Sequence, residues 1–217
     1  MHIYEGILTG NQAGQGVIVA GWALTAVGTA VGLCKIDEEQ IPRVAVLSAT
    51  FFVISLIHVP LGPTSEHLLL TGLMGLVLGW AAFPAVLVAL LLQSVFFGFG
   101  GLVTLGVNTL NMAFPAVVCH YLFRRAVRHG HEPAVFAVGF AAGATAVLLA
   151  AILNAGSLRI AGEQFREVSI LVAALHLPLA AVEGVVTASV VLLLRKVRPE
   201  LLDAPLLTPS SQEVSNG

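Results

Sequence analysis

The chain has 217 residues, of which 57% are hydrophobic and only 10% are charged, and its formal net charge is −2. Soluble globular domains carry about a quarter charged residues, and a chain of this length cannot bury so many uncharged segments around one core. A soluble fold is therefore excluded, and the near-neutral charge gives no basis for binding nucleic acid. The composition predicts an integral membrane protein.

Five apolar segments are candidates for membrane-spanning helices, which need roughly 20 residues each. In chain order they are 16–33, 44–59, 108–123, 134–153 and 168–194. A further apolar piece, 67–97, is long for one helix and short for two. Gly79, Trp80 and Pro84 interrupt it near the middle, and proline breaks a helix interior.

The positions of Lys and Arg favour two helices within 67–97, because basic residues collect in cytoplasmic loops. With two helices, eight basic residues face the cytoplasm: Lys35, Arg43, Arg124, Arg125, Arg128, Arg195, Lys196 and Arg198. Arg159 and Arg166 are then the two outside, whereas one helix would give four inside and six outside. We therefore predict an all-α bundle of about seven transmembrane helices, with an extracytoplasmic N-terminus and a cytoplasmic C-terminus.

The transmembrane domain is predicted to cover residues 1–198, and 199–217 to form a disordered cytoplasmic tail rich in Pro, Ser and small residues. The N-terminus has no basic region and no cleavage site of a secretory signal peptide, so Met1 is expected to be retained. The two cysteines are expected to be small packing residues without a disulfide. Three glycine pairs with four-residue spacing favour close helix packing, although glycine is also simply frequent in membrane helices: Gly28/Gly32, Gly75/Gly79 and Gly139/Gly143.

His2 offers a chelating set of nitrogens if Met1 has a free amine. The amine, the His2 amide nitrogen and the imidazole Nδ1 close a five-membered and a six-membered ring on one ion, filling three corners of a square. His67, which follows a Pro/Gly-rich loop, is the candidate for the fourth corner. Such a site suits Ni²⁺ or Cu²⁺ and excludes Mg²⁺ and Ca²⁺, which prefer oxygen. The alternative is that His2 is an exposed residue with no ligand role.

Other polar residues on the predicted outer side each allow two interpretations. His58 either caps its helix or is a spare ligand, and Glu66 either tunes the charge near the metal or is a solvated loop carboxylate. His176 and Glu183 are seven residues apart and share a helical face, where they are expected to hold the bundle in register. The predicted topology places three histidines on the cytoplasmic side, away from the site: His120, His129 and His131.

Four stretches resemble the CbiM/NikM family, the substrate-binding (S) components of energy-coupling-factor transporters for cobalt and nickel. They are Met-His-Ile-Tyr-Glu-Gly at 1–6, Pro-Thr-Ser-Glu-His at 63–67, Phe-Gly-Phe-Gly-Gly…Leu-Gly-Val-Asn at 97–108, and His-Leu-Pro…Glu-Gly at 176–184. They run in order, so the resemblance covers nearly the whole chain apart from its tail.

The resemblance implies a metal site formed by Met1, His2 and His67, in agreement with the chelate argument. It also places Asn108, His176 and Glu183 around the ligands. We group Ser65 and Glu66 of the loop with these surrounding residues, although this loop departs from the Ser/Cys-Ser-His version common in cobalt members.

By the same resemblance, the chain is expected to be a multi-pass protein of the cell inner (cytoplasmic) membrane, surrounded by lipid. Its partners would be a transmembrane coupling (T) subunit, ATPase subunits and a small accessory membrane subunit. The sequence has no G-x-x-x-x-G-K-[ST] phosphate loop, so it is predicted not to be an enzyme and to leave ATP hydrolysis to a partner.

The transported substrate is expected to be Co²⁺ or Ni²⁺, with no organic cofactor. Glu5 resembles cobalt members, where nickel members often carry Asp, and this favours Co²⁺ uptake for corrin (vitamin B12) synthesis. Square geometry by itself favours nickel or copper.

Two other classes of function are less consistent with the sequence. An intramembrane metalloenzyme needs an open position for water, and neither H-E-x-x-H nor G-x-S-x-G is present. A passive channel favours several weak sites along a pore.

Overall fold

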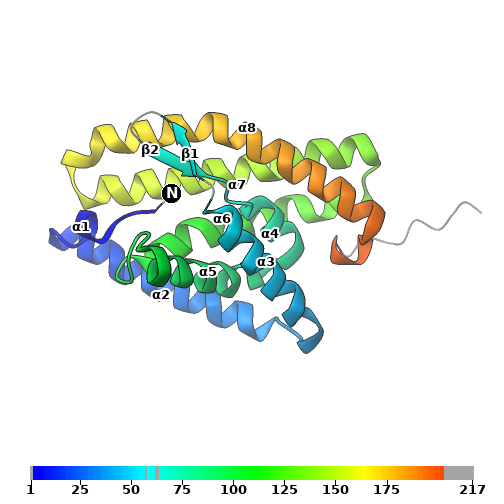
Figure 1. The fold of residues 1–217 in the computed structure, drawn as a ribbon, viewed down its shortest axis with the longest axis horizontal. Helices are drawn as coiled ribbons and strands as arrows, with labels where there is room; N and C mark the ends of the chain where they lie inside the picture. The colour runs from blue at the N-terminus through cyan, green and yellow to red at the C-terminus, as the bar shows by residue number, and fades with distance from the viewer. Residues whose placement is uncertain (1, 57, 62–63, 203–217) are drawn as a thin grey trace, which may run out of the picture.

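The computed structural model of the chain describes residues 2–56, 58–61 and 64–202, with 58–61 and 64–66 described by their backbone alone. Nearly all of the secondary structure is helical (Figure 1). The elements are α1 (Glu5–Leu8), α2 (Gln12–Cys34), η1 (Glu38–Gln40), α3 (Ile41–Ile54), β1 (His58–Leu61), β2 (Thr64–His67), α4 (Thr71–Leu78), η2 (Gly79–Ala81), α5 (Ala82–Phe97), α6 (Leu105–His129), α7 (Glu132–Ala161), η3 (Glu163–Phe165), α8 (Arg166–Val197) and η4 (Pro199–Leu202).

Four helical stretches within the described residues are long and apolar enough to cross a membrane: 12–34, 71–97, 132–161 and 163–197. This confirms a helical protein with several candidate spans. The other two predicted segments, 44–59 and 108–123, correspond to the shorter α3 and to α6. The count of seven spans and the orientation of the termini stay predictions.

The stretch 71–97 is broken where the sequence predicts, between α4 and α5. Gly79 has φ +56°, a conformation that favours glycine. Trp80 donates a hydrogen bond from Nε1 to the Tyr121 hydroxyl (2.8 Å), and the Lys35 Nζ lies 5.8 Å from its ring centroid. The break thus lies beside the C-terminal end of α2. Because α4 begins near His67 and α5 ends at Phe97, close to the N-terminal segment, the two helices run in opposite directions.

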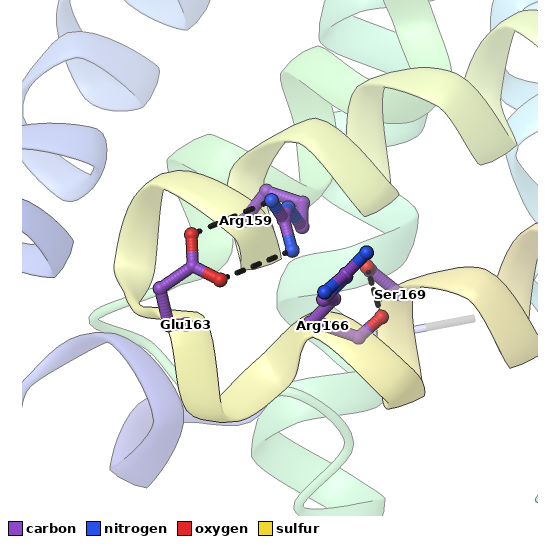
Figure 2. Close-up of polar contacts among 4 residues, drawn as sticks. All are labelled: Arg159, Glu163, Arg166 and Ser169. Carbon is purple, nitrogen blue, oxygen red and sulfur yellow. Dashed lines mark hydrogen bonds and ion pairs between the residues drawn. The ribbon is translucent and has the colours of Figure 1, made fainter.

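The two ends of the bundle differ in charge. At the end with Lys35, the Arg195 guanidinium donates to the carbonyls of Val127 and Gly130, which closes the C-terminal end of α6. Arg159 and Arg166 lie at the opposite end, where Arg159 pairs with Glu163 at 3.4 Å (Figure 2). That pair is exposed and contributes little stability. The separation matches the predicted grouping of the basic residues at one end.

Two local features add detail to the predicted helical fold. The segment before α4 contains a short antiparallel strand pair, β1 and β2, in which His58 pairs with His67. At the other end of the chain Pro199–Leu202 forms η4 and Leu202 is buried, while the boundary of the tail stays a prediction. The Glu200 carboxyl has a lowered pKa, because it is hydrogen-bonded to the Glu200 backbone amide and lies near Arg198 and Arg43. Residues 203–217 lie outside the described residues.

Close helix contacts occur at glycines. A Cβ added at Gly143 of α7 would lie 2.6 Å from the Glu183 carbonyl oxygen of α8, and one at Gly72 of α4 would lie 2.7 Å from the Gly143 Cα. Neither contact leaves space for a side chain. The predicted glycine pairs behave in the same way, since each of their members meets a neighbouring segment closely. Cys34 and Cys119 are free thiols: Cys119 is a buried packing residue, as predicted, whereas Cys34 is exposed at the end of α2, so the packing prediction is wrong for Cys34.

We expect Gly143→Ala to destabilise the protein by about 1–3 kcal/mol, because its methyl group would overlap the backbone of α8. Thermal unfolding in detergent measures the effect. Gly16→Ala is the matched control, because nothing lies within 4 Å of its added Cβ. Equal stability of the two variants would contradict the tight α7–α8 contact.

Candidate metal site

The N-terminal segment packs against α6 through Ile3, whereas His2 is half-buried and Tyr4 is exposed. Ile3 is only 2% exposed, and its amide donates to the Asn108 Oδ1 at 2.9 Å. The Ile3 carbonyl accepts from the Asn108 Nδ2 at 3.1 Å and from the Thr104 hydroxyl at 2.9 Å. One side-chain amide of α6 therefore replaces the backbone partner that a neighbouring strand would provide, and it fixes the position of the adjacent His2.

A glycine turn closes over this segment between α5 and α6. The Glu5 amide donates to the Gly100 carbonyl at 3.2 Å, and the Val103 amide donates to the Glu5 Oε1 at 2.7 Å. Gly101 has φ +104°, and a Cβ there would lie 2.3 Å from that same Glu5 oxygen. Gly101 of the motif is thus explained by the close approach of the N-terminal segment.

His2 and His67, the two predicted ligand histidines, are brought together. Their ring centroids are 5.3 Å apart with a 35° tilt, and His67 is 1% exposed. The Phe99 ring lies 5.9 Å from His2 on the side of the glycine turn. Met1 lies outside the described residues.

Hydrogen bonds define which nitrogen of each ring has a lone pair. The His67 Nδ1 lies 3.1 Å from the Leu68 carbonyl oxygen, and the His2 Nε2 lies 3.0 Å from the Gln93 Oε1. Both oxygens can only accept, so these two nitrogens carry the hydrogens. The lone pairs are therefore on His67 Nε2 and His2 Nδ1. A histidine that binds a metal through one ring nitrogen usually donates the N–H of its second ring nitrogen to an acceptor.

Gln93 is the contact that sequence reasoning missed. It is fully buried, and the signal was an amide side chain within the run 82–97, in which Ser94 is the only other polar residue. Neither periodicity nor spacing indicates its partner, because 91 residues separate it from His2.

Glu183 supports the segment that follows His67. It is fully buried on α8, and its Oε2 accepts from the Leu69 amide at 2.9 Å, with the Leu70 amide also bonded to the carboxylate. The carboxylate thus lies at the N-terminus of α4, where a helix favours negative charge. His176, also fully buried on α8, has its Nδ1 2.6 Å from the Val172 carbonyl of its own helix.

The remaining predicted residues are placed as follows. Ser65, Glu66 and His58 lie in the hairpin, and their side chains are outside the description. His120 lies at the other end of the molecule, where its Nδ1 is 2.9 Å from the Gly75 carbonyl and its Nε2 is 3.2 Å from Arg124. Among the described residues, no three His, Cys, Asp or Glu side chains gather as metal ligands.

Two facing histidines, one of them in an N-terminal segment anchored by buried Ile3, in a bundle with several candidate membrane spans, form a framework suited to a metal-handling membrane protein. Comparison with known proteins agrees. The model of the CbiM family, described as the cobalt uptake substrate-specific transmembrane region, matches residues 2–201. The chain belongs to this family.

Relatives of known name and structure support the assignment. The chain is 40% identical to a Haemophilus influenzae protein with a provisional metal-transport name, over 94% of this chain and 97% of that one. It is 33% identical to the cobalt transport protein CbiM of Sorangium cellulosum, over 87% of this chain and 93% of the other. A crystal structure of a transition metal transporter superposes with a TM-score of 0.69 at 27% identity, covering 91% of this chain and 93% of that chain.

We expect Asn108→Leu to release the N-terminal segment, because the Ile3 amide and carbonyl lose their shared partner. Hydrogen exchange at the Ile3 amide should accelerate at least about tenfold, in keeping with the roughly 1–3 kcal/mol cost of an unsatisfied buried group. Ser48→Ala is the control, because that buried hydroxyl donates to the Ala85 carbonyl and bonds to neither Ile3 nor Asn108. Unchanged exchange in Asn108→Leu would contradict the anchoring role.

Proposed function

We propose that this chain is the metal-capture subunit of an ATP-driven energy-coupling-factor importer for Co²⁺. The observation that carries the proposal is the pair of facing imidazoles of half-buried His2 and buried His67, with ring centroids 5.3 Å apart and lone pairs on His2 Nδ1 and His67 Nε2. Membership of a cobalt uptake family and relatives named for cobalt and nickel transport support it.

The proposed ligands are the Met1 amine, the His2 amide nitrogen, the His2 Nδ1 and the His67 Nε2. The lone pair on Nδ1 is the one this chelate requires, because only that nitrogen closes a six-membered ring with the amide. Asn108 would hold the segment in place through Ile3, and Glu183 would hold the segment after His67 through Leu69. Ser65, Glu66 and His176 complete the proposed surroundings of the ion.

We propose Co²⁺ as the substrate, for corrin synthesis, with Ni²⁺ uptake by the same type of transporter as the alternative. Glu5 belongs to the cobalt version of the N-terminal motif, and here its carboxylate binds the Val103 amide of the glycine turn. The nickel alternative draws on a Rhodobacter capsulatus relative, a fused nickel transport protein that is 34% identical over 98% of this chain and 67% of that protein. A site with four nitrogens in a square also suits Ni²⁺.

The proposed partners are a transmembrane coupling subunit, ATPase subunits and a small accessory membrane subunit in the inner membrane. In this proposal the outer loops order over the ion, and the partners then reorient the bundle and expose the site to the cytoplasm. Neither ATP hydrolysis nor the reorientation is assigned to residues of this chain.

His67→Ala should weaken Co²⁺ and Ni²⁺ binding by more than about 100-fold, beyond the range known for residues that only support a ligand. Isothermal titration of the purified protein measures the affinity. His129→Ala is the matched control and should bind as the wild type does, because His129 ends α6 at the opposite end of the bundle. Equal losses in the two variants would place the metal elsewhere.

Uptake of radioactive cobalt into proteoliposomes should require both internal ATP and the partner subunits. A transporter subunit alone should bind the metal without accumulating it. Uptake by this chain alone, down a gradient and without ATP, would contradict the importer and favour a channel.

A further inference from the structure

Gln93 joins the proposed metal ligand His2 to the end of α3. Its side chain is fully buried in α5, where an amide is costly unless its polar atoms are hydrogen-bonded. The Oε1 lies 3.0 Å from the His2 Nε2, and the Nε2 amide donates to the Ser55 hydroxyl. Both ends of the amide are therefore bonded, to segments far apart in sequence.

The hydrogen bonds of Ser55 determine which groups donate and which accept in the contacts from Ser55 through Gln93 to His2. Ser55 is the C-cap of α3 and is fully buried, and its hydroxyl donates to the Phe52 carbonyl at 2.9 Å. Its hydrogen is thereby used, so towards Gln93 the hydroxyl can only accept. The Gln93 amide must then present its NH₂ group to Ser55 and its oxygen to His2. That oxygen accepts only from an Nε2 that carries hydrogen.

We propose that Ser55 and Gln93 are positioning residues that hold His2 in the Nε2–H tautomer, so that the lone pair is on Nδ1, the nitrogen that the proposed chelate uses. This inference rests on the proposed function, because the tautomer serves a purpose only if the ion is chelated by the His2 amide and Nδ1. The same contacts tie the ligand to the end of α3, four residues from the start of β1, the strand paired with the one that ends at His67.

The first test uses no metal. The tautomer of His2 is measured by nitrogen NMR on the full-length protein with ¹⁵N-labelled histidine, and the His2 signal is assigned by comparison with His2→Ala. The wild type should show hydrogen on Nε2. Gln93→Met, similar in length but without an acceptor, should show a mixture of tautomers, while Gln93→Glu should keep hydrogen on Nε2 because a carboxylate also accepts. An unchanged tautomer in Gln93→Met would overturn the inference.

The second test measures Co²⁺ and Ni²⁺ affinity by titration with the metal alone. Gln93→Met should bind about 10–100-fold more weakly, the range typical of groups that orient a metal ligand. Ser55→Ala frees the amide to turn and should weaken binding in the same direction. Ser48→Ala is the matched control, because that buried α3 hydroxyl donates to the Ala85 carbonyl of α5 and contacts no histidine. It should bind as the wild type does, and a loss equal to that of Ser55→Ala would mean that only α3–α5 packing is involved.

The two tests separate this inference from the proposed function. If the wild type shows the Nε2–H tautomer, lost in Gln93→Met, but binds neither metal, the positioning of the ring stands and the metal-capture function fails. If the wild type binds metal tightly and Gln93→Met binds equally well, the capture function stands and the positioning role fails.

Discussion

The candidate site depends on the pairing of the Ile3 backbone with the Asn108 side chain. A chain terminus is normally exposed, because its backbone polar groups need partners and water is the easiest source. Here one amide accepts from the Ile3 N–H and donates to the Ile3 carbonyl, and Thr104 adds a second donor. With those groups bonded, Ile3 can be buried against α6 at little cost. This positions the adjacent His2, whose ring lies next to His67 and within hydrogen-bond distance of Gln93.

The bundle is built so that a short helix can end beside this segment. α4 has only eight residues, it begins just after His67, and a carboxylate from α8 holds the amides at its start. Glycines on α4 and α7 let the neighbouring backbones approach closely, which leaves no room for water along these contacts. At its other end α4 stops at Gly79, and the chain returns in α5 to deliver Gln93 and Phe99 to the histidines. The break in the apolar stretch therefore positions residues on both of its sides.

Much of this arrangement could be predicted from local sequence. Hydropathy located the helices, Gly79 marked the break, and the distribution of basic residues anticipated that Lys35 and Arg195 share one end of the bundle. Chelate geometry, together with the resemblance at the N-terminus, predicted that His2 and His67 would meet. The hairpin was expected to be a loop, because its prolines and glycine hide the pairing of His58 with His67. The partners of Gln93 and Glu183 were not predictable, since one amide or carboxylate in an apolar run indicates a buried contact without saying which distant segment provides it.

The most direct measurement is Co²⁺ and Ni²⁺ binding to the purified protein with its native N-terminus, beside a version with one alanine placed before Met1. The extension removes the Met1 amine as a ligand and leaves every described contact of Ile3, Gln93 and His67 in place. Tight binding is expected to be lost in the extended protein and retained in the native one, with the relative affinities indicating the metal. Equal binding by both proteins would contradict a site formed by the amine, the amide and the imidazole.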